Sequence, residues 1–182
     1  MRDLLSNSVR TMAAVDETVR LSARERRAWD GFNTAITMLT EHLERRLHEA
    51  GMSHAHYLVL AALAAAPDHT LRLHELACEA RFSRSRLSHA VGRLAAAGWI
   101  RREACPSDKR GAFATLTPAG AEALRAATPA RDAAVKQALF AALTEEQVDR
   151  LGEISDAVTG ALSGVCDAAR EADGCAGGGQ LR

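Results

Sequence analysis

Residues 81–120 have the sequence RFSRSRLSHAVGRLAAAGWIRREACPSDKRGAFATLTPAG, and they contain the strongest structural signals in the chain. The first part predicts a helix. Ser83 offers a side-chain oxygen that can cap a helix N-terminus, and Gly98 is a common helix stop. Between them the apolar positions recur at helical spacing, at Leu87, Val91 and Leu94. We therefore expect a helix from Ser83 to about Ala97 that buries one face.

A β-hairpin is predicted directly after this helix. Residues 99–103 alternate apolar and polar side chains, as a half-buried strand does, and residues 112–116 return as a second strand. Residues 105–111, CPSDKRG, are charged and rich in turn formers. Thr117 and Pro118 then supply the capping residue and the first-turn proline of another helix.

Residues 22–49 are predicted to form one long helix ahead of this segment. Ser22 and Glu25 make a capping box at its start, and Gly51 ends it. At 1.5 Å per residue the helix is about 40 Å long, more than a compact domain of this size needs. A single apolar stripe runs along it: Trp29, Phe32, Ile36, Leu39, Leu43 and Leu47.

The C-terminal part is predicted to hold two more helices, over residues 119–141 and 144–169. Pro129 is expected to kink or interrupt the first of them. The second again carries an apolar stripe: Val148, Leu151, Ile154, Val158, Leu162 and Val165. The small central module cannot bury the stripes at both ends of the chain. A second copy of the chain is therefore the expected partner, in a homodimer.

The remaining elements complete a mainly α fold with a small β-hairpin. Residues 53–66 are expected to form a helix that Pro67 stops, residues 70–72 a short extended piece, and residues 73–80 a small helix. Together, these elements predict a winged helix-turn-helix with long N- and C-terminal dimerisation helices. Its expected parts are an N-terminal extension (1–21), a dimerisation helix (22–50), a DNA-binding module (51–118), C-terminal dimerisation helices (119–170) and a flexible tail (171–182).

The charge distribution is uneven although the formal net charge is zero. Residues 71–116 carry nine lysines and arginines against four acids, whereas residues 144–173 carry eight acids against two arginines. The basic central segment is therefore suited to meet phosphate, while the acidic C-terminal part faces elsewhere.

Several classes of protein are disfavoured. No apolar run approaches the roughly 20 residues that a bilayer span needs, and residues 1–20 lack the apolar core of a signal peptide. We therefore expect a cytoplasmic protein with no membrane partner. The four cysteines form no CxxC pair, which indicates reduced thiols rather than a disulfide framework. No nucleophile elbow, Walker loop, dinucleotide fingerprint or HExxH occurs, so neither an enzyme nor a cofactor is expected.

The predicted helix from Ser83 has an outer face suited to duplex DNA. At about 100° per residue, short side chains lie opposite the apolar face and cations lie at its edges. Such a face can turn donors and acceptors toward base edges and cations toward phosphates. Arg84, at the helix N-terminus, can reach a phosphate beside the free amides. An ordinary amphipathic helix also turns a polar face to solvent, so this pattern alone does not prove DNA binding. The outer face of the predicted helix consists of Ser85, His89, Gly92 and Ala96, flanked by Arg86, Ser88 and Arg93.

The hairpin tip is the second feature that points to DNA. Asp108 and Arg110 are separated by one residue, so the carboxylate can hold the guanidinium through a charge-assisted hydrogen bond. A pre-oriented arginine on a hairpin suits a narrow minor groove, where negative potential is focused. Lys109 beside it is expected to meet phosphate. A simple salt bridge within the turn is the plainer alternative.

Residues 51–126 resemble the core of the multiple-antibiotic-resistance regulator (MarR) family. The matching elements, in order, are LHELA, SRSRLSHAVGRL, AAAGWIRRE, SDKRG and LTPAG. The resemblance implies a sequence-specific regulator of transcription that binds duplex DNA as a homodimer, on an inverted-repeat operator. It implies helices in successive major grooves and wing arginines in the flanking minor grooves. It also implies a repressor released by a small, often phenolic or aromatic-acid, effector bound between the dimer helices and the DNA-binding module.

By position, the resemblance assigns Asp108 and Arg110 to the family's wing pair. It assigns the base-reading places to Ser85, Arg86, Ser88 and His89. His89 stands where an arginine is common and Gly92 where an acid is common, which puts the family's operator sequence in doubt here. Four residues are expected near the effector, although core or interface packing explains each one by itself: Trp29, Met52, His54 and Tyr57.

Two other functions remain open. One is redox regulation on the same fold through Cys105, where the cations of the wing can stabilise a thiolate. The other is a protein-interaction scaffold that does not bind DNA, which the polar outer face of the helix disfavours, because a protein-binding groove needs apolar anchors. A metal site is not expected. His54 and His56 are two residues apart and so point to different faces of a helix.

Overall fold

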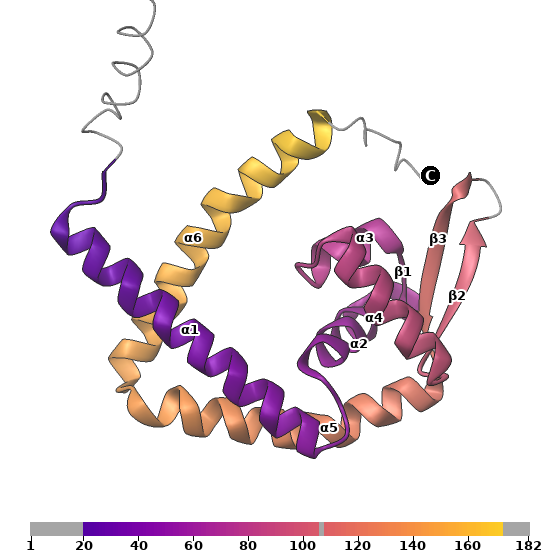
Figure 1. Ribbon diagram of the computed structural model, residues 1–182, viewed down its shortest axis with the longest axis horizontal. Helices are drawn as coiled ribbons and strands as arrows, with labels where there is room; N and C mark the ends of the chain where they lie inside the picture. The colour runs from indigo at the N-terminus through magenta and orange to yellow at the C-terminus, as the bar shows by residue number, and fades with distance from the viewer. Residues whose placement is uncertain (1–19, 106–107, 173–182) are drawn as a thin grey trace, which may run out of the picture.

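The structure is a computed structural model that describes residues 20–105 and 108–172. For residue 105, residues 108–111 and residues 163–172 it describes the backbone alone. Figure 1 shows the elements in chain order. They are α1 (Ala23–Glu49), α2 (His54–Ala65), η2 (Pro67–His69), β1 (Thr70–Arg72), α3 (Leu73–Glu79), α4 (Arg84–Ala96), β2 (Ile100–Cys105), β3 (Asp108–Leu116), α5 (Pro118–Ala138), η3 (Phe140–Ala142) and α6 (Glu145–Ala172).

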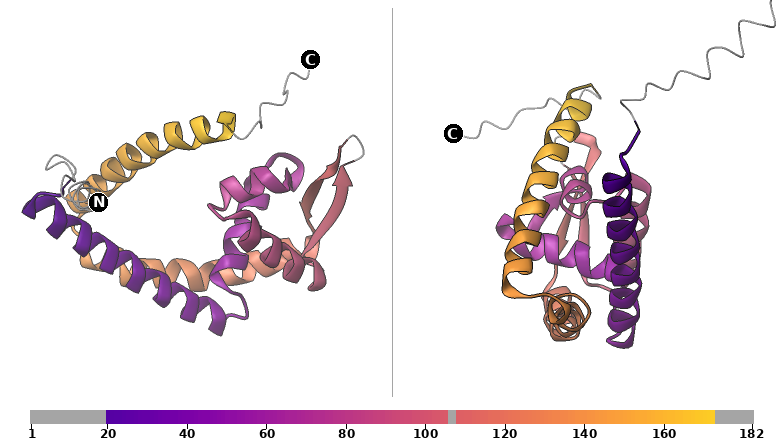
Figure 2. Two further views of the ribbon diagram at one scale, coloured as in Figure 1. Left: turned by 45° about the horizontal axis from the view of Figure 1, so that its top comes forward. Right: turned by 90° about the vertical axis from the view of Figure 1, so that its left-hand side faces the viewer.

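The elements form a small module carried on long helices. Helices α2, α3 and α4 and the sheet make up the module at one end of the molecule, and α1 packs along α5 beneath it (Figure 1). From the far end of α5, α6 turns back toward the side of the molecule on which the module lies, and it stands apart from the module (Figures 1 and 2). The long helices therefore reach well beyond the module that they carry.

Capping residues mark the starts of the helices, and those of α1, α4 and α5 are the residues that the sequence predicts. The Ser22 hydroxyl accepts from the Glu25 N–H at 3.3 Å, and the Glu25 carboxylate accepts from the Ser22 N–H at 2.8 Å, which completes the capping box of α1. The side chains of Ser53, Ser83 and Thr117 cap α2, α4 and α5 in the same way. Each of these hydroxyls satisfies an amide that the first helical turn leaves free.

A single apolar core lies between α2, α3, α4 and the sheet, and the end of α1 closes it. Each fully buried leucine stabilises the fold by about 1.5–3 kcal/mol relative to an exposed one. Because α4 contributes its predicted apolar face to this core, its opposite face lies in solvent. The largest side chains that are fully buried are Leu47, Leu60, Leu63, Leu76 and Leu94, with Val59 and Val91.

The sheet has three antiparallel strands in the order β1-β3-β2, so the predicted hairpin gains a third strand. Thr70 pairs with Thr115 and Ile100 pairs with Leu116. The extended piece at residues 70–72 joins because it lies beside β3, a contact across more than 40 residues that no local pattern contains. The hairpin strands are also longer than expected, since β2 continues to Cys105 and β3 begins at Asp108.

Pro129 does not interrupt α5, which continues through it from Pro118 to Ala138. A proline in a helix interior removes one hydrogen bond and pushes against the preceding turn, so it bends a helix more readily than it ends one. Packing against α1 supports the helix on both sides of the proline. Figure 1 shows α5 as a bowed but continuous helix.

Large apolar side chains remain exposed on the long helices. On α1, Trp29 and Phe32 are more than half exposed, and their rings lie 6.5 Å apart. On α6, Ile154, Val158 and Leu162 are equally exposed. These positions belong to the two predicted stripes. Among the stripe side chains that the structure describes, those of α1 alone enter the core of their own chain, at the C-terminal end of the helix. None of the described helices combines the length and apolarity that crossing a membrane requires.

Candidate nucleic-acid interface

The outer face of α4 is exposed and polar. Leu87, Ala90, Val91 and Leu94 are buried, which turns the opposite side of the helix to solvent. A Cβ added at Gly92 would meet no atom within 4 Å, so the backbone itself is open there. The face therefore presents short side chains at its centre, and cations stand at its end and edges. Its exposed residues are Arg84, Ser85, Arg86, Ser88, His89 and Arg93, all of them predicted for DNA contact.

The first turn of α4 is strongly electropositive. It contains Arg84 and Arg86 and no acidic residue. The helix macrodipole adds a partial positive charge of roughly half a unit at this end, where cations are unfavourable unless an anion lies nearby. The turn therefore has the charge and the free amides that bind an oxyanion such as a phosphate.

Arg86 packs against an aromatic ring that the sequence reasoning did not connect with it. Its Cζ atom lies 4.1 Å from the ring centroid of Phe82, a residue of the turn between α3 and α4. Phe82 is 9% exposed and belongs to the core. The spacing of four residues between an aromatic and an arginine at a helix start is the signal that could have predicted this contact.

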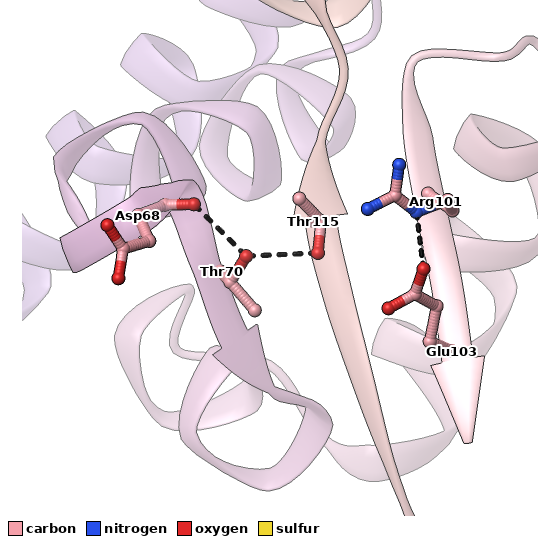
Figure 3. A network of polar contacts seen from close by, with 5 residues as sticks. All are labelled: Asp68, Thr70, Arg101, Glu103 and Thr115. Atoms are coloured by element: carbon pink, nitrogen blue, oxygen red, sulfur yellow. Dashed lines mark hydrogen bonds and ion pairs between the residues drawn. The ribbon is translucent and has the colours of Figure 1, made fainter. Parts of the chain in front are cut away.

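The base of the hairpin is tied to the rest of the sheet. Thr70 on β1 is hydrogen-bonded through its hydroxyl to Thr115 on β3 at 3.0 Å and to the carbonyl oxygen of Asp68 at 3.1 Å. On β2, Arg101 donates to Glu103 (Figure 3). The Thr70–Thr115 contact joins β1 to β3, whereas Arg101 and Glu103 lie on the same strand. The side chains of Cys105, Asp108, Lys109 and Arg110 lie outside the described residues, so their predicted roles stay predictions.

The four residues predicted near an effector do not meet in one chain. Met52 and Tyr57 are buried in the core beside the start of α2, and His54 is partly buried there. Trp29 is 56% exposed on α1 and lies 18 residues before Leu47, which is about 27 Å along the helix. Within a single chain, therefore, only Met52, His54 and Tyr57 are neighbours.

Two charged residues that the sequence reasoning missed lie at the start of α2. The Glu44 carboxylate, from α1, accepts from the backbone N–H of His54 at 3.0 Å. The Arg131 guanidinium, from α5, lies 5.8 Å from the ring centroid of Tyr57. Both are contacts between different helices, and no sequence spacing indicated them. Together they join α1, α2 and α5 beside the module.

Burial lowers the pKa of His54 and of His56 below the ordinary imidazole value. For His54, Glu44 opposes this shift, and Arg131 and Arg86 reinforce it. For His56, Arg93 reinforces the shift and Glu44 again opposes it. A carboxylate of α1 and cations of α4 therefore act on the two histidines in opposite directions. Among the described residues, no group of three or more histidine, cysteine or acidic side chains is arranged to hold a metal ion.

These lowered pKa values predict a loss of stability in mild acid. The unfolded chain binds protons at His54 and His56 more readily than the folded chain does, so protonation favours unfolding. Stability is therefore complete above the unfolded imidazole pKa of about 6.5 and falls as the pH drops through that value. We expect the urea concentration at the unfolding midpoint to be independent of pH under alkaline conditions and to decline below about pH 7.

A His54→Gln, His56→Gln double variant should show a shallower decline than the wild type. The matched control is His89→Gln, at an exposed position on α4, which should follow the wild-type profile. A double variant with an unchanged acid profile would show that these two histidines are not the groups responsible.

The order of α2, α3 and α4 followed by the β2–β3 hairpin defines a winged helix-turn-helix protein. A family model described as MarR family matches residues 50–111. Sco3205, a MarR family transcriptional regulator from Streptomyces coelicolor solved in complex with DNA, is 50% identical, with a TM-score of 0.71. That alignment covers 77% of this chain and 89% of Sco3205. The chain therefore belongs to the MarR family of transcriptional regulators.

Two further structures extend the comparison. AbsC, a MarR family transcriptional regulator from Streptomyces coelicolor, is 32% identical with a TM-score of 0.71, over 80% of this chain and 98% of its own. BpsR of Bordetella bronchiseptica, whose DNA binding is regulated by 6-hydroxynicotinic acid, is 16% identical with a TM-score of 0.67. That alignment covers 73% of this chain and 98% of BpsR and shows a shared fold. A search of curated proteins finds no match.

Proposed function

We propose that the protein is a sequence-specific regulator of transcription that binds duplex DNA as a homodimer, on an inverted-repeat operator. The observation that carries the proposal is the outer face of α4, whose short polar side chains lie between Arg84 at one end and Arg93 at its edge. A major-groove helix needs small donors and acceptors toward base edges and cations toward phosphates. The solved complex of Sco3205 with DNA supports this assignment.

Base reading falls to Ser85, Ser88 and His89 in this proposal. Their side chains are exposed on the outer face of α4, and Gly92 leaves room for close approach of a base edge. Replacing Ser88 or His89 is therefore expected to change which operator is preferred as well as how tightly it is held. The hairpin carries the second contact, with Arg110 in the minor groove, Asp108 orienting it and Lys109 on a phosphate.

The protein acts, in this proposal, as a repressor that a small molecule releases. Met52, His54 and Tyr57 lie where α1 and α5 meet the start of α2. In this proposal, the second copy supplies Trp29 to the complete site. The Arg131 guanidinium, which lies 5.8 Å from the Tyr57 ring centroid, gives this region a cation that can pair with an acidic effector. BpsR, which has the same fold, responds to an aromatic acid.

Selection of binding sites from random duplexes tests the proposal. Two-fold symmetry requires an inverted repeat with half-sites about 10 bp apart, centre to centre. Affinity for the selected site should fall steeply with salt, because each phosphate contact releases counterions. Selection that returns no palindrome would contradict the assignment of α4.

The proposed DNA contacts of the β2–β3 hairpin are tested on the same operator. Arg110→Ala should cost about 1–3 kcal/mol per half-site, and Asp108→Ala less, because the arginine survives but must be ordered on binding. Lys109→Ala should weaken all sequences about equally and flatten the salt slope by about one unit per half-site. All three variants should remain dimeric. Unchanged affinity of a dimeric Arg110→Ala protein would mean that the hairpin does not read DNA.

A further inference from the structure

Arg86 is held by a ring that is itself fixed in place. Phe82 immediately precedes the capping residue Ser83, and its backbone N–H donates to the Ala77 carbonyl at 2.8 Å. Arg81 before it adopts a left-handed conformation, with φ +56°, which turns the chain sharply from α3 into α4. Because Phe82 is 9% exposed and part of the core, its ring stays in place when the Arg86 side chain moves.

The stack restrains a side chain that otherwise has many conformers. A free arginine carries about 2 kcal/mol of rotamer entropy, part of which must be lost whenever its guanidinium makes a fixed contact. At 4.1 Å from the ring centroid, the Arg86 guanidinium lies well inside the range of a cation–π contact. A guanidinium has five N–H donors, and a contact with an aromatic ring leaves donors available for an anion.

The direction of the side chain separates Arg86 from the base-reading residues. Side chains on a helix lean toward the N-terminus, and Phe82 lies before the first turn, so the stack draws the guanidinium back toward the turn that precedes α4. In the described part of the chain, no carboxylate forms an ion pair with Arg86. The charge therefore lies unpaired beside the free amides of the helix N-terminus, where an anion is favoured.

We infer that Phe82 is a positioning residue that presents Arg86 to a DNA phosphate at the edge of the major groove, rather than to a base. This inference rests on the proposed function, in which α4 enters that groove, and it departs from the base-reading place that the resemblance gives Arg86. The ring orders the guanidinium before DNA arrives, and a smaller entropy loss on binding raises affinity without adding sequence preference.

A double-mutant cycle on the selected operator tests the inference, with Phe82→Leu, Arg86→Gln and the combination of both. Arg86→Gln should weaken matched and mismatched operators by the same factor, about tenfold, and flatten the salt slope by about one unit per half-site. Phe82→Leu should weaken binding about two- to fivefold, the scale of an exposed cation–π contact. In the Arg86→Gln background, Phe82→Leu should have no further effect.

Conservative variants separate positioning from packing. Phe82→Tyr keeps the ring and should keep wild-type affinity, whereas Phe82→Met keeps much of the volume and should behave as Phe82→Leu does. Thermal unfolding and dimer mass are recorded for every variant. If Phe82→Leu is too unstable to assay, Phe82→Met takes its place in the cycle, and Arg86→Lys gives a second perturbation of the stack.

Two results would overturn the inference while leaving the proposed function intact. One is an equal loss from Phe82→Leu in the wild-type and Arg86→Gln backgrounds, which would indicate a packing role alone. The other is an Arg86→Gln loss confined to certain base pairs, which would make Arg86 a base reader. Failure of the wild-type protein to bind any inverted repeat would instead contradict the proposed function.

Discussion

Replacing Gly120 with alanine should destabilise the protein by at least about 3 kcal/mol, more than ordinary overpacking of a core does. Gly120 lies in the first turn of α5, and a Cβ there would stand 2.0 Å from the Trp99 carbonyl oxygen and 2.9 Å from the Leu116 side chain. Such an overlap with a backbone oxygen is not relieved by a rotamer change. The thermal midpoint should fall by roughly 6–12 °C, the scale for a chain of this length.

The Trp99 carbonyl group cannot move aside because hydrogen bonds hold it and its neighbours in place. The Trp99 carbonyl accepts from the Thr117 N–H at 3.1 Å, and the Trp99 N–H donates to the Leu94 carbonyl at 3.0 Å. The Thr117 hydroxyl in turn donates to the Gly98 carbonyl at 2.7 Å and accepts from the Gly120 N–H at 3.1 Å. A shift of Trp99 would therefore disturb the end of α4, the start of β2 and the cap of α5 at once.

Gly92→Ala is the matched control, because it adds the same methyl group inside a helix. Nothing lies within 4 Å of a Cβ at Gly92, so alanine should stabilise α4 by about 0.5–1 kcal/mol through its higher helix propensity. Chemical denaturation of both variants gives the comparison. Equal stability of Gly120→Ala and the wild type would contradict the close approach of Trp99 to α5.

The long elements could be predicted because their signals are local. A hydroxyl at a helix start, an apolar residue every three or four positions and a glycine at the end lie within one segment of chain. Such signals predicted the starts of α1, α4 and α5 at Ser22, Ser83 and Thr117. The third strand could not be predicted in this way, because residues 70–72 become a strand only when β3 lies beside them.

The outer face of α4 was predictable for the same reason, since one helix holds all of its residues. What the sequence did not show are contacts between elements. Glu44 reaches the His54 amide across a helix junction, and Arg131 reaches Tyr57 from α5. The resemblance placed Trp29 and Met52 near the same effector, although about 27 Å of helix separates Trp29 from Leu47 near the end of α1 in one chain. A site assembled from two copies would reconcile that grouping with the structure.

The exposed apolar faces of α1 and α6 predict that the protein forms a homodimer, independently of where an effector binds. Trp29 and Phe32 on α1 and Ile154, Val158 and Leu162 on α6 are each at least half exposed in the single chain. Each such side chain contributes about 1.5–3 kcal/mol when it is fully buried, so a partner that covers both faces gains considerable free energy. Helix α6 also projects from the rest of the chain and has little of its own chain to pack against (Figure 1).

Light scattering at micromolar concentration should therefore give about twice the chain mass of 19.4 kDa. Val158→Glu, in the middle of the α6 stripe, should yield a monomer, because a dimer would bury two carboxylates without partners. Operator binding should be lost with the dimer, since a single half-site is held far more weakly than two linked ones.

Asp156→Asn, which alters charge on the polar side of α6, is the control and should leave both mass and binding unchanged. A monomeric wild type would remove the two-fold axis on which the inverted repeat depends, and a dimeric Val158→Glu protein would exclude the centre of α6 from the interface.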